Sequence, residues 1–435
     1  MQNCMRKILL TSCLLLCGAV LAWAQPAASY PLGKVEFVGL KKYDRQQALT
    51  ASELKTGQSV TLAALDAAAK KLAALGYFRR VNYRYQLNNN KLDVVFEVEE
   101  AGGAVPCVFD NFAGFTDREL VEEVRKEIPS FDGTAPEVGD SVQKVKVALE
   151  RILQKRGLPG QVEHLFSVGS EGFYRPEHVF TIKDLHLNIC KVRVLGAASV
   201  PMNELQPVAQ QLVGSEYSKI NARGLAELDL MQVFRKYGYL RARFGLPLGE
   251  LDFESKDCKD GVSVTLPVDA GASYSWDRAE WAGNQALPTP FLDVTVGMRA
   301  GDVADGPRID KGLRTIYEAY VKKGYLAARL QPAPEFDDAN KRVILKVAIS
   351  EGAQFRMGTL TILGIPPADV QRCKERWQLK AGDVYDGTYV AEFIQRIVKE
   401  GIVKLDAGKN LKVEPKPDAQ KQSVDVTINF DAKVQ

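Results

Sequence analysis

The clearest pattern of hydrophobic and polar positions runs from Gly57 to Glu99. Between Thr61 and Leu75 the apolar side chains recur on one helical face, Thr61 is a suitable N-cap, and Gly76 stands where the helix ends. Two segments follow in which apolar and polar residues alternate, with three asparagines between them. The pattern predicts an amphipathic helix followed by a β-hairpin.

The same pattern returns along the whole chain. The glycine after the helix recurs at intervals of 81, 81, 86 and 77 residues, as Gly76, Gly157, Gly238, Gly324 and Gly401. A short apolar strand and a first helix precede each copy, so the order of elements is strand, helix, helix, strand, strand. Repetition with this period is typical of an array of small, similar domains.

We therefore predict an α+β fold, a tandem array of about five β-α-α-β-β domains. The expected domains are residues 31–101, 103–187 (the most divergent), 189–270, 272–352 and 353–432. Each unit buries one face of a small sheet against its two helices, and the order of elements leaves at least one sheet edge unpaired.

Composition narrows the class of protein. The chain has 435 residues, 46% hydrophobic and 26% charged, as expected of several globular domains. Its 57 lysines and arginines and 54 acidic residues are interspersed and give a net charge of +3. A nucleic-acid-binding protein concentrates its basic residues in a stripe or patch, so the sequence argues against that class.

The N-terminus has the pattern of a secretory signal peptide, residues 1–24. A basic pair, Arg6 and Lys7, precedes an apolar stretch, and a small-x-small site predicts cleavage after Ala24. The segment Leu10–Cys13 resembles a lipobox, and lipidation at Cys13 is the alternative, although the apolar run before it is short. No later run is apolar and long enough for a membrane-spanning helix.

Four cysteines follow the signal peptide, and none forms a CxxC pair. Cys107 and Cys190 flank the second repeat in predicted strands. Two interpretations stay open for them, a disulfide between Cys107 and Cys190 or two isolated buried thiols.

The sequence argues against catalysis. The three histidines all lie in the second repeat, and no third ligand accompanies them at metal-binding spacing. No nucleophile elbow, P-loop or dinucleotide-binding motif occurs. We expect no enzymatic activity, no metal, no cofactor and no small-molecule substrate.

Three segments carry a resemblance to a known family. They are Leu75–Val81, with its Gly-Tyr-Phe; Tyr320 with Gly324–Leu326; and Glu351–Phe355 leading to Ile362–Gly364. The repeats resemble POTRA domains, the periplasmic modules of BamA-like outer-membrane protein assembly factors. The likeness extends over about residues 31–432.

Members of this group carry a C-terminal transmembrane β-barrel after the last POTRA domain. Such a barrel needs many alternating segments, and only five residues follow Phe430. The expectation is therefore an array without a transmembrane barrel, which retains the binding half of the family's function.

The resemblance implies that the strand after the Gly-Tyr turn is an exposed sheet edge, open to β-augmentation by an extended peptide. That strand is Arg79–Leu87 in repeat one, Leu240–Leu246 in repeat three and Leu326–Leu330 in repeat four. The candidate binding residues are Arg79, Arg80, Val81, Tyr83, Tyr85, Leu240, Ala242, Phe244, Leu326, Ala328 and Leu330.

The resemblance also implies a periplasmic location near the outer membrane. The expected partners are unfolded outer-membrane β-barrel proteins or a barrel-bearing assembly factor, bound at the exposed edges. The alternative is a structural envelope adaptor that holds one fixed protein partner and binds no client peptide. The sequence does not separate the two.

Overall fold

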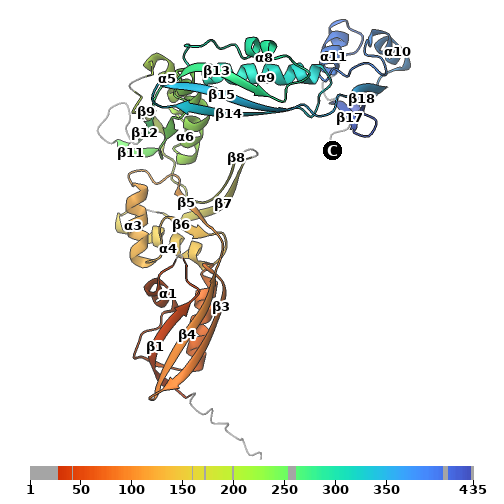
Figure 1. Cartoon of the computed structure of the whole chain (residues 1–435). Helices are drawn as coiled ribbons and strands as arrows, with labels where there is room; N and C mark the ends of the chain where they lie inside the picture. Colours follow the sequence, from red (N-terminus) through yellow and green to blue (C-terminus); the bar gives the residue numbers. More distant parts are fainter. Residues whose placement is uncertain are drawn as a thin grey trace, which may run out of the picture. The chain divides into compact units, whose positions relative to one another are not determined.

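The computed structural model describes residues 28–41, 43–158, 160–170, 173–197, 200–252, 261–404 and 410–432. The predicted signal peptide, residues 1–24, and the alternative lipidation site, Cys13, lie outside the described residues. The chain divides into two compact units. The first comprises residues 1–109 and 117–183, and the second comprises residues 110–116 and 184–435. Figure 1 shows their helices and strands.

The described residues form five small sheets, one in each predicted repeat. In every sheet the first strand runs parallel to the last strand, and the last strand pairs antiparallel with the strand before it. This arrangement confirms the predicted fold class, whereas the domain bounds stay a prediction. Among the helices of the described ranges, none is both long enough and apolar enough to cross a bilayer.

The first repeat has the strand order β2-β1-β4-β3. Leu65 and Leu72 of its second helix are fully buried against Val94 and Phe96 of the last strand. As predicted, Thr61 caps that helix, because its hydroxyl accepts a hydrogen bond from the Ala64 amide at 3.2 Å. The elements are β1 (Tyr30–Val38), α1 (Arg45–Ser52), β2 (Ser59–Val60), α2 (Leu62–Ala74), β3 (Phe78–Asn88) and β4 (Lys91–Glu100).

The second repeat has the equivalent order β6-β5-β8-β7. Its core is built from the second helix, where Val145 and Leu149 are fully buried, and from Phe109 and Phe180 on neighbouring strands. The elements are β5 (Ala104–Phe109), α3 (Asp117–Glu127), β6 (Thr134–Pro136), α4 (Asp140–Lys155), β7 (Val162–Ser170) and β8 (Phe173–Ile182).

In the third repeat, two short strands pair with the same side of the last strand, and the first strand pairs with its other side. The elements are β9 (Ile189–Leu195), α5 (Met202–Ala209), a 3₁₀ turn at Gln210–Leu212, α6 (Lys219–Leu225), a π turn at Ala226–Leu230, α7 (Met231–Lys236), β10 (Arg243–Phe244), β11 (Leu248–Asp252) and β12 (Gly261–Asp269).

The fourth and fifth repeats have three-stranded sheets in the orders β13-β15-β14 and β16-β18-β17. In Figure 1 the two helices of the fourth repeat lie along one face of its sheet. The elements are β13 (Ser275–Ala282), α8 (Thr289–Val296), α9 (Gly306–Lys322), β14 (Arg329–Asp337), β15 (Arg342–Ser350), β16 (Arg356–Leu363), α10 (Pro367–Arg376), α11 (Tyr389–Lys399), β17 (Asn410–Asp418) and β18 (Ser423–Ala432).

The glycine that ends the second helix also forms the junction to the next repeat. The carbonyl oxygens of Gly238 and Gly324 accept hydrogen bonds from the amides of Tyr274 and Phe355, at 2.9 and 2.8 Å. Both glycines have positive φ, 79° and 82°. A Cβ on either would lie 2.6 Å from the carbonyl oxygen of its partner. Only glycine therefore satisfies both the helix end and the close approach.

The residues after this glycine continue into the next repeat. Leu240 packs against the core of the fourth repeat, and Leu326 packs against the core of the fifth. Arg235 makes a two-pronged ion pair with Asp310 of the fourth repeat, with N–O distances of 2.6 and 3.0 Å. The Gly-Tyr-Leu segments of repeats three and four are therefore inter-repeat contacts.

Candidate peptide-binding edge strands

β3 is the edge strand of the first sheet, as the sequence predicts. It runs for 11 residues without a proline and pairs along one side with β4. On its other side, no strand from the described part of the chain pairs with it. Its outward-facing amide and carbonyl groups are therefore available to an added strand.

The side chains of β3 alternate between an apolar row and a charged row. Tyr83 contacts Phe96, with ring centroids 5.9 Å apart, and its hydroxyl donates to an Asp66 carboxylate oxygen at 2.6 Å. Burial, together with that hydrogen bond, raises the pKa of Tyr83 to about 12. Tyr85 and Leu87 continue the row and are each 50% exposed, so they offer apolar surface to an incoming strand.

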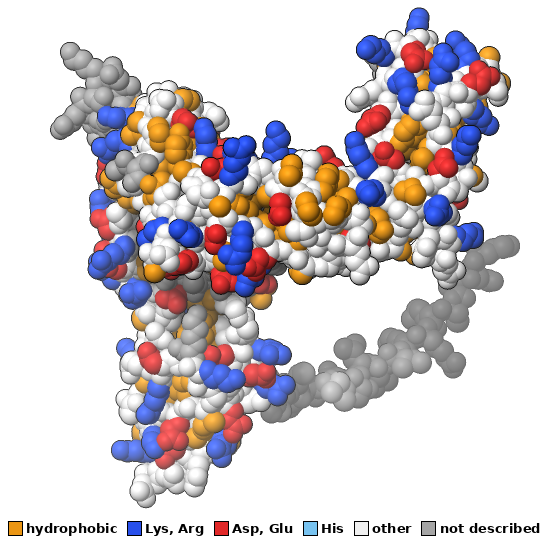
Figure 2. All heavy atoms as spheres, turned by 45° about the horizontal axis from the view of Figure 1, so that its top comes forward, with side chains coloured by type: hydrophobic (Ala, Val, Ile, Leu, Met, Phe, Trp, Pro, Cys, Tyr) orange, Lys and Arg blue, Asp and Glu red, His pale blue; other side chains and the backbone are white. Residues whose placement is uncertain are grey.

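Arg80 and Arg84 belong to the charged row, Arg79 lies at a bulge beside Arg80, and all three pair across the hairpin. Arg79 lies 3.3 Å and Arg80 3.9 Å from carboxylate oxygens of Glu99, and Arg84 lies 3.1 Å from Glu97. Exposed pairs of this kind add little stability. Figure 2 shows the same mixture of basic and acidic side chains across the face drawn. The charges keep the edge soluble without closing it.

The predicted strand of repeat three is not formed as expected. Only Arg243 and Phe244 pair as β10, while Leu240 and Ala242 lie before it. Ala242 is buried in the core of the third repeat, and the Phe244 ring packs edge-on against Phe234 at 5.5 Å. The prediction is wrong here because Leu240 packs against repeat four, while Ala242 and Phe244 pack into the core of repeat three.

The hairpin edge of the third sheet is also occupied. Residues 110–116 pack onto it, and the Gly114 amide donates to the Gly249 carbonyl oxygen of β11 at 3.0 Å. Asp110 in the same segment accepts hydrogen bonds from the Ser218 hydroxyl and the Ile220 amide, both at 2.9 Å. This edge therefore already has a neighbour.

In repeat four the predicted strand begins too early. β14 starts at Arg329, so Leu330 lies in it, whereas Leu326 and Ala328 precede it. Ala328 is buried in the core of the fourth repeat. The physical reason is the same as in repeat three, because Leu326 packs against the fifth repeat and Ala328 into the core of its own repeat.

Two edge strands carry proline at alternate positions. In β14, Pro332 and Pro334 face Val347 and Leu345 of β15. Proline has no amide hydrogen, so inside an antiparallel ladder it fits where that hydrogen would point away from the partner strand. β14 therefore lacks two successive donors on its outer side. In β17, Pro415 and Pro417 have the same effect.

The positions of these prolines can be transferred to β3. A Cβ on Gly39 would lie 2.0 Å from the Val98 carbonyl oxygen, and one on Gly283 would lie 2.2 Å from that of Ile349. Val98 of β4 and Ile349 of β15 therefore occupy equivalent positions in the last strands of their repeats. Two and four residues before Val98 are Phe96 and Val94, which pair with Tyr83 and Tyr85. Two and four residues before Ile349 are Val347 and Leu345, which pair with Pro332 and Pro334. Pro332 is therefore equivalent to Tyr83, and Pro334 to Tyr85. The outer donors missing from β14 are present in β3.

The sequence did not single out β7, the edge strand of the second sheet. It runs for 9 residues without proline, and Leu165 and Val168 on it are 66% and 51% exposed. The signal in the sequence is the alternation of polar and apolar residues at Gln161–Ser167. This signal is less prominent because the second repeat differs most from the others.

Two segments of the chain, residues 30–101 and 274–352, match the POTRA family model, described as a surface antigen variable number repeat. These two segments of the chain are POTRA repeats. A putative outer membrane protein assembly factor of Treponema pallidum (strain Nichols) is 20% identical over 438 residues. That alignment covers 97% of this chain and 50% of the relative, so the chain spans half the length of that relative.

Two solved structures of POTRA domains are also similar to parts of this chain. POTRA domains 3–5 of BamA from Haemophilus influenzae are 17% identical, covering 57% of this chain and 97% of that chain, with a TM-score of 0.44. POTRA domains 1–3 of Omp85 from Anabaena are 16% identical with the same coverage and a TM-score of 0.26. The predicted resemblance to the POTRA region of BamA-like assembly factors is confirmed by the family match and the relative.

Of the two interpretations left open for Cys107 and Cys190, the disulfide between them is wrong. Cys107 carries a free thiol, and Cys190 is disulfide-bonded to a different cysteine. Burial, reinforced by the charge of Asp132, raises the pKa of Cys107 to about 12. The other interpretation, two isolated buried thiols, is only partly met, because Cys107 is an isolated but half-buried thiol and Cys190 is disulfide-bonded.

Two histidines of the second repeat contact one another across its hairpin. His164 Nε2 lies 2.9 Å from His178 Nδ1, and His178 Nε2 lies 2.8 Å from the Pro136 carbonyl oxygen. His178 therefore donates through Nε2 and accepts through Nδ1. Within the described ranges, no group of three or more histidine, cysteine, aspartate or glutamate residues is placed to hold a metal ion.

Proposed function

We propose that this chain is an exported, periplasmic POTRA protein of outer-membrane protein assembly. It binds extended segments of unfolded outer-membrane β-barrel proteins by strand addition at the open edge of β3. A barrel-bearing assembly factor is the second class of partner that the same edge would accept. The observation that carries the proposal is the long, proline-free β3 edge, paired on one side only.

The chemistry of this edge suits many clients. Main-chain hydrogen bonds do not depend on the client's side chains, so affinity comes from the strand geometry. Val81, Tyr83, Tyr85 and Leu87 would favour apolar residues at every second position of the client. Alternating apolar and polar residues are the pattern of transmembrane β-strands.

A proline transplant tests the proposal. Tyr83→Pro combined with Tyr85→Pro copies Pro332 and Pro334 into β3 and removes two outward donors while leaving the β4 ladder intact. Since each main-chain hydrogen bond contributes about 1 kcal/mol, binding of a labelled peptide from a transmembrane β-strand should weaken about tenfold or more. Fluorescence anisotropy with mature residues 25–435 measures the affinity.

The matched control is Tyr83→Val with Tyr85→Val, which removes the same rings and keeps both amide hydrogens. This variant should bind nearly as wild type, because valine favours a strand and leaves the edge open. The reciprocal variant, Pro332→Val with Pro334→Val, should add a binding site on β14. Strand addition at β3 is wrong if the proline variant binds like wild type, or if the valine variant loses as much affinity.

The alternative function, a structural adaptor with one fixed partner, has one observation in its favour. β14 and β17 both carry edge prolines, so repeats four and five have the features of surfaces that avoid strand addition. Capture from envelope extracts separates the two functions. The adaptor would retain one stoichiometric partner equally in wild type and in the Tyr83→Pro, Tyr85→Pro variant.

A further inference from the structure

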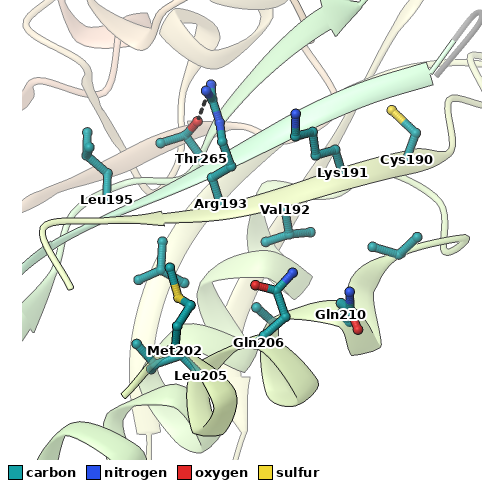
Figure 3. Close-up of a pocket in the computed structure, with 13 residues that line it drawn as sticks. Cys190, Lys191, Val192, Arg193, Leu195, Met202, Leu205, Gln206, Gln210 and Thr265 are labelled. Carbon is teal, nitrogen blue, oxygen red and sulfur yellow. Dashed lines mark hydrogen bonds between the residues drawn. The ribbon is translucent and has the colours of Figure 1, made fainter. Parts of the chain in front are cut away.

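A groove in the third repeat lies between β9 and α5 (Figure 3). Its volume is about 780 Å³. Val192 on the strand and Leu205 on the helix face each other across it, and Met202 and Gln206 lie along its helical side (Figure 3). The groove is therefore mainly apolar at its base, with an amide at its mouth.

The groove opens beside an unpaired strand edge. β9 pairs with β12 along one side only. On the other side, the Gly214 amide donates to the Ile189 carbonyl oxygen at 2.7 Å, and the Ile189 amide donates to Ser215 at 2.8 Å. Beyond Ile189, no strand from the described residues lies beside Lys191–Leu195. Main-chain groups and an apolar groove are thus available side by side.

The apolar side chains around the groove are unusually exposed. Met202 is 57% and Val213 43% exposed, whereas Leu195, which is 63% exposed, lies on the opposite face of β9 with Lys191 and Arg193 (Figure 3). In the fourth repeat, Trp281 occupies the position of Val194, two residues before the glycine that ends the strand. Its indole nitrogen donates to Asp293 on α8 at 2.7 Å, so strand and helix are bridged there. Repeat three has a small valine instead and keeps the space.

Two cations lie on the opposite face of β9 (Figure 3). Arg193 is 3.9 Å from Glu250 and 3.5 Å from the Thr265 hydroxyl, which are long contacts. Lys191 is exposed and makes no ion pair with a described residue. Side chains alternate between the two faces of a strand. A strand added to β9 would therefore place every second side chain beside these cations and the intervening side chains in the groove.

We infer that the β9–α5 groove binds an extended acidic segment of a protein partner, with apolar residues at alternate positions. The apolar side chains enter the groove above Leu205, and the carboxylates of the intervening residues lie beside Lys191 and Arg193. Main-chain bonds to Lys191–Leu195 align the segment. This surface is not the β3 edge. The arginines of β3 are already paired with glutamates, whereas the cations beside the β9–α5 groove are available to select an acidic occupant.

A charge-swap experiment tests the inference. The probe is a short fluorescent peptide of alternating valine and glutamate, added to mature residues 25–435. Lys191→Glu with Arg193→Glu should weaken its binding about tenfold, since two attractions become two repulsions. The same variant should gain affinity for a peptide of alternating valine and lysine. Lys34→Glu, at the equivalent position of β1, is the matched control and should bind as wild type.

Hydrogen exchange locates the bound peptide independently of charge. The valine-glutamate peptide should slow exchange of the amides of residues 191–195, and Met202→Glu should abolish that protection by placing a carboxylate at the groove mouth. Failure of the valine-lysine peptide to rescue the charge-reversed variant overturns the inference. So does an absence of binding, or protection at β3 without protection at β9. None of these results bears on the Tyr83 and Tyr85 proline variants, which test the β3 proposal separately.

Discussion

At the scale of single residues, the junction glycines are constrained both by their backbone conformation and by a close approach. Gly324 combines a φ of 82° with the close approach of the Phe355 carbonyl oxygen. Gly382 has a comparable φ of 90°, but a Cβ there would meet nothing within 4 Å. Substitution of Gly382 therefore tests backbone strain alone, whereas substitution of Gly324 tests backbone strain together with loss of the junction.

We predict that Gly324→Ala lowers the free energy of unfolding by about 2 kcal/mol or more, because positive φ costs an alanine about 1–2 kcal/mol and the contact must also open. Gly382→Ala should cost about 1 kcal/mol, the strain alone. Urea unfolding followed by circular dichroism measures both. Equal losses would mean that the glycine serves only to end the helix.

The helix caps show how far single residues can be predicted from sequence. Ser218 and Asp305 each lie four residues after a glycine, as Thr61 does after Gly57. Both accept hydrogen bonds from the third amides of their helices, at 3.1 and 2.9 Å. Asp386 shares that spacing, but it accepts from the Thr388 amide at 2.8 Å, and α11 begins at Tyr389. A local turn competes with the cap, and the spacing does not reveal which of them forms.

At the scale of elements, periodicity predicts the strands and helices but not which edges stay open. β3 is an open edge because its hairpin begins directly after the Gly-Tyr turn. In repeats three and four, Leu240 and Leu326 pack into the next repeat, which is a tertiary contact that a single repeat's pattern does not contain. The edge prolines of β14 and β17 were visible in the sequence as Pro-x-Pro, and only the ladder register gives them meaning.

The histidine pair of the β7–β8 hairpin makes the second repeat sensitive to pH. Burial lowers the pKa of His178 in the folded state, and burial and the neighbouring His178 lower that of His164. The unfolded chain then binds more protons below the ordinary histidine pKa of about 6.5. The free energy of unfolding should therefore fall as the pH decreases from about 7 through that value.

Urea unfolding at several pH values, with hydrogen exchange of β7 and β8 as the local probe, measures this dependence. His178→Gln should flatten it, because the titrating group is lost while a side-chain amide can still donate to Pro136. His186→Gln, outside the pair, should leave the dependence in β7 and β8 unchanged. A pH dependence that survives in His178→Gln would assign it to other groups.

At the scale of the whole molecule, the two compact units differ in their exposed edges. The first unit contains β3 and β7, which are free of proline and paired on one side. In the second unit, prolines restrict β14 and β17, residues 110–116 pack against β11, and β9 remains open beside its groove. The first unit thus has two proline-free open edges, and the second unit has an open edge, β9, beside an apolar groove and two cations.

Hydrogen exchange of the full mature chain, with and without a chemically unfolded outer-membrane β-barrel protein, tests the central claim most directly. Strand addition at β3 predicts slower exchange of the outward amides of residues 79–88, including those of Tyr83 and Tyr85. No new protection is expected in β14 or β17, whose outer donors are missing. Unchanged exchange in β3, or protection confined to β14 and β17, would contradict the account.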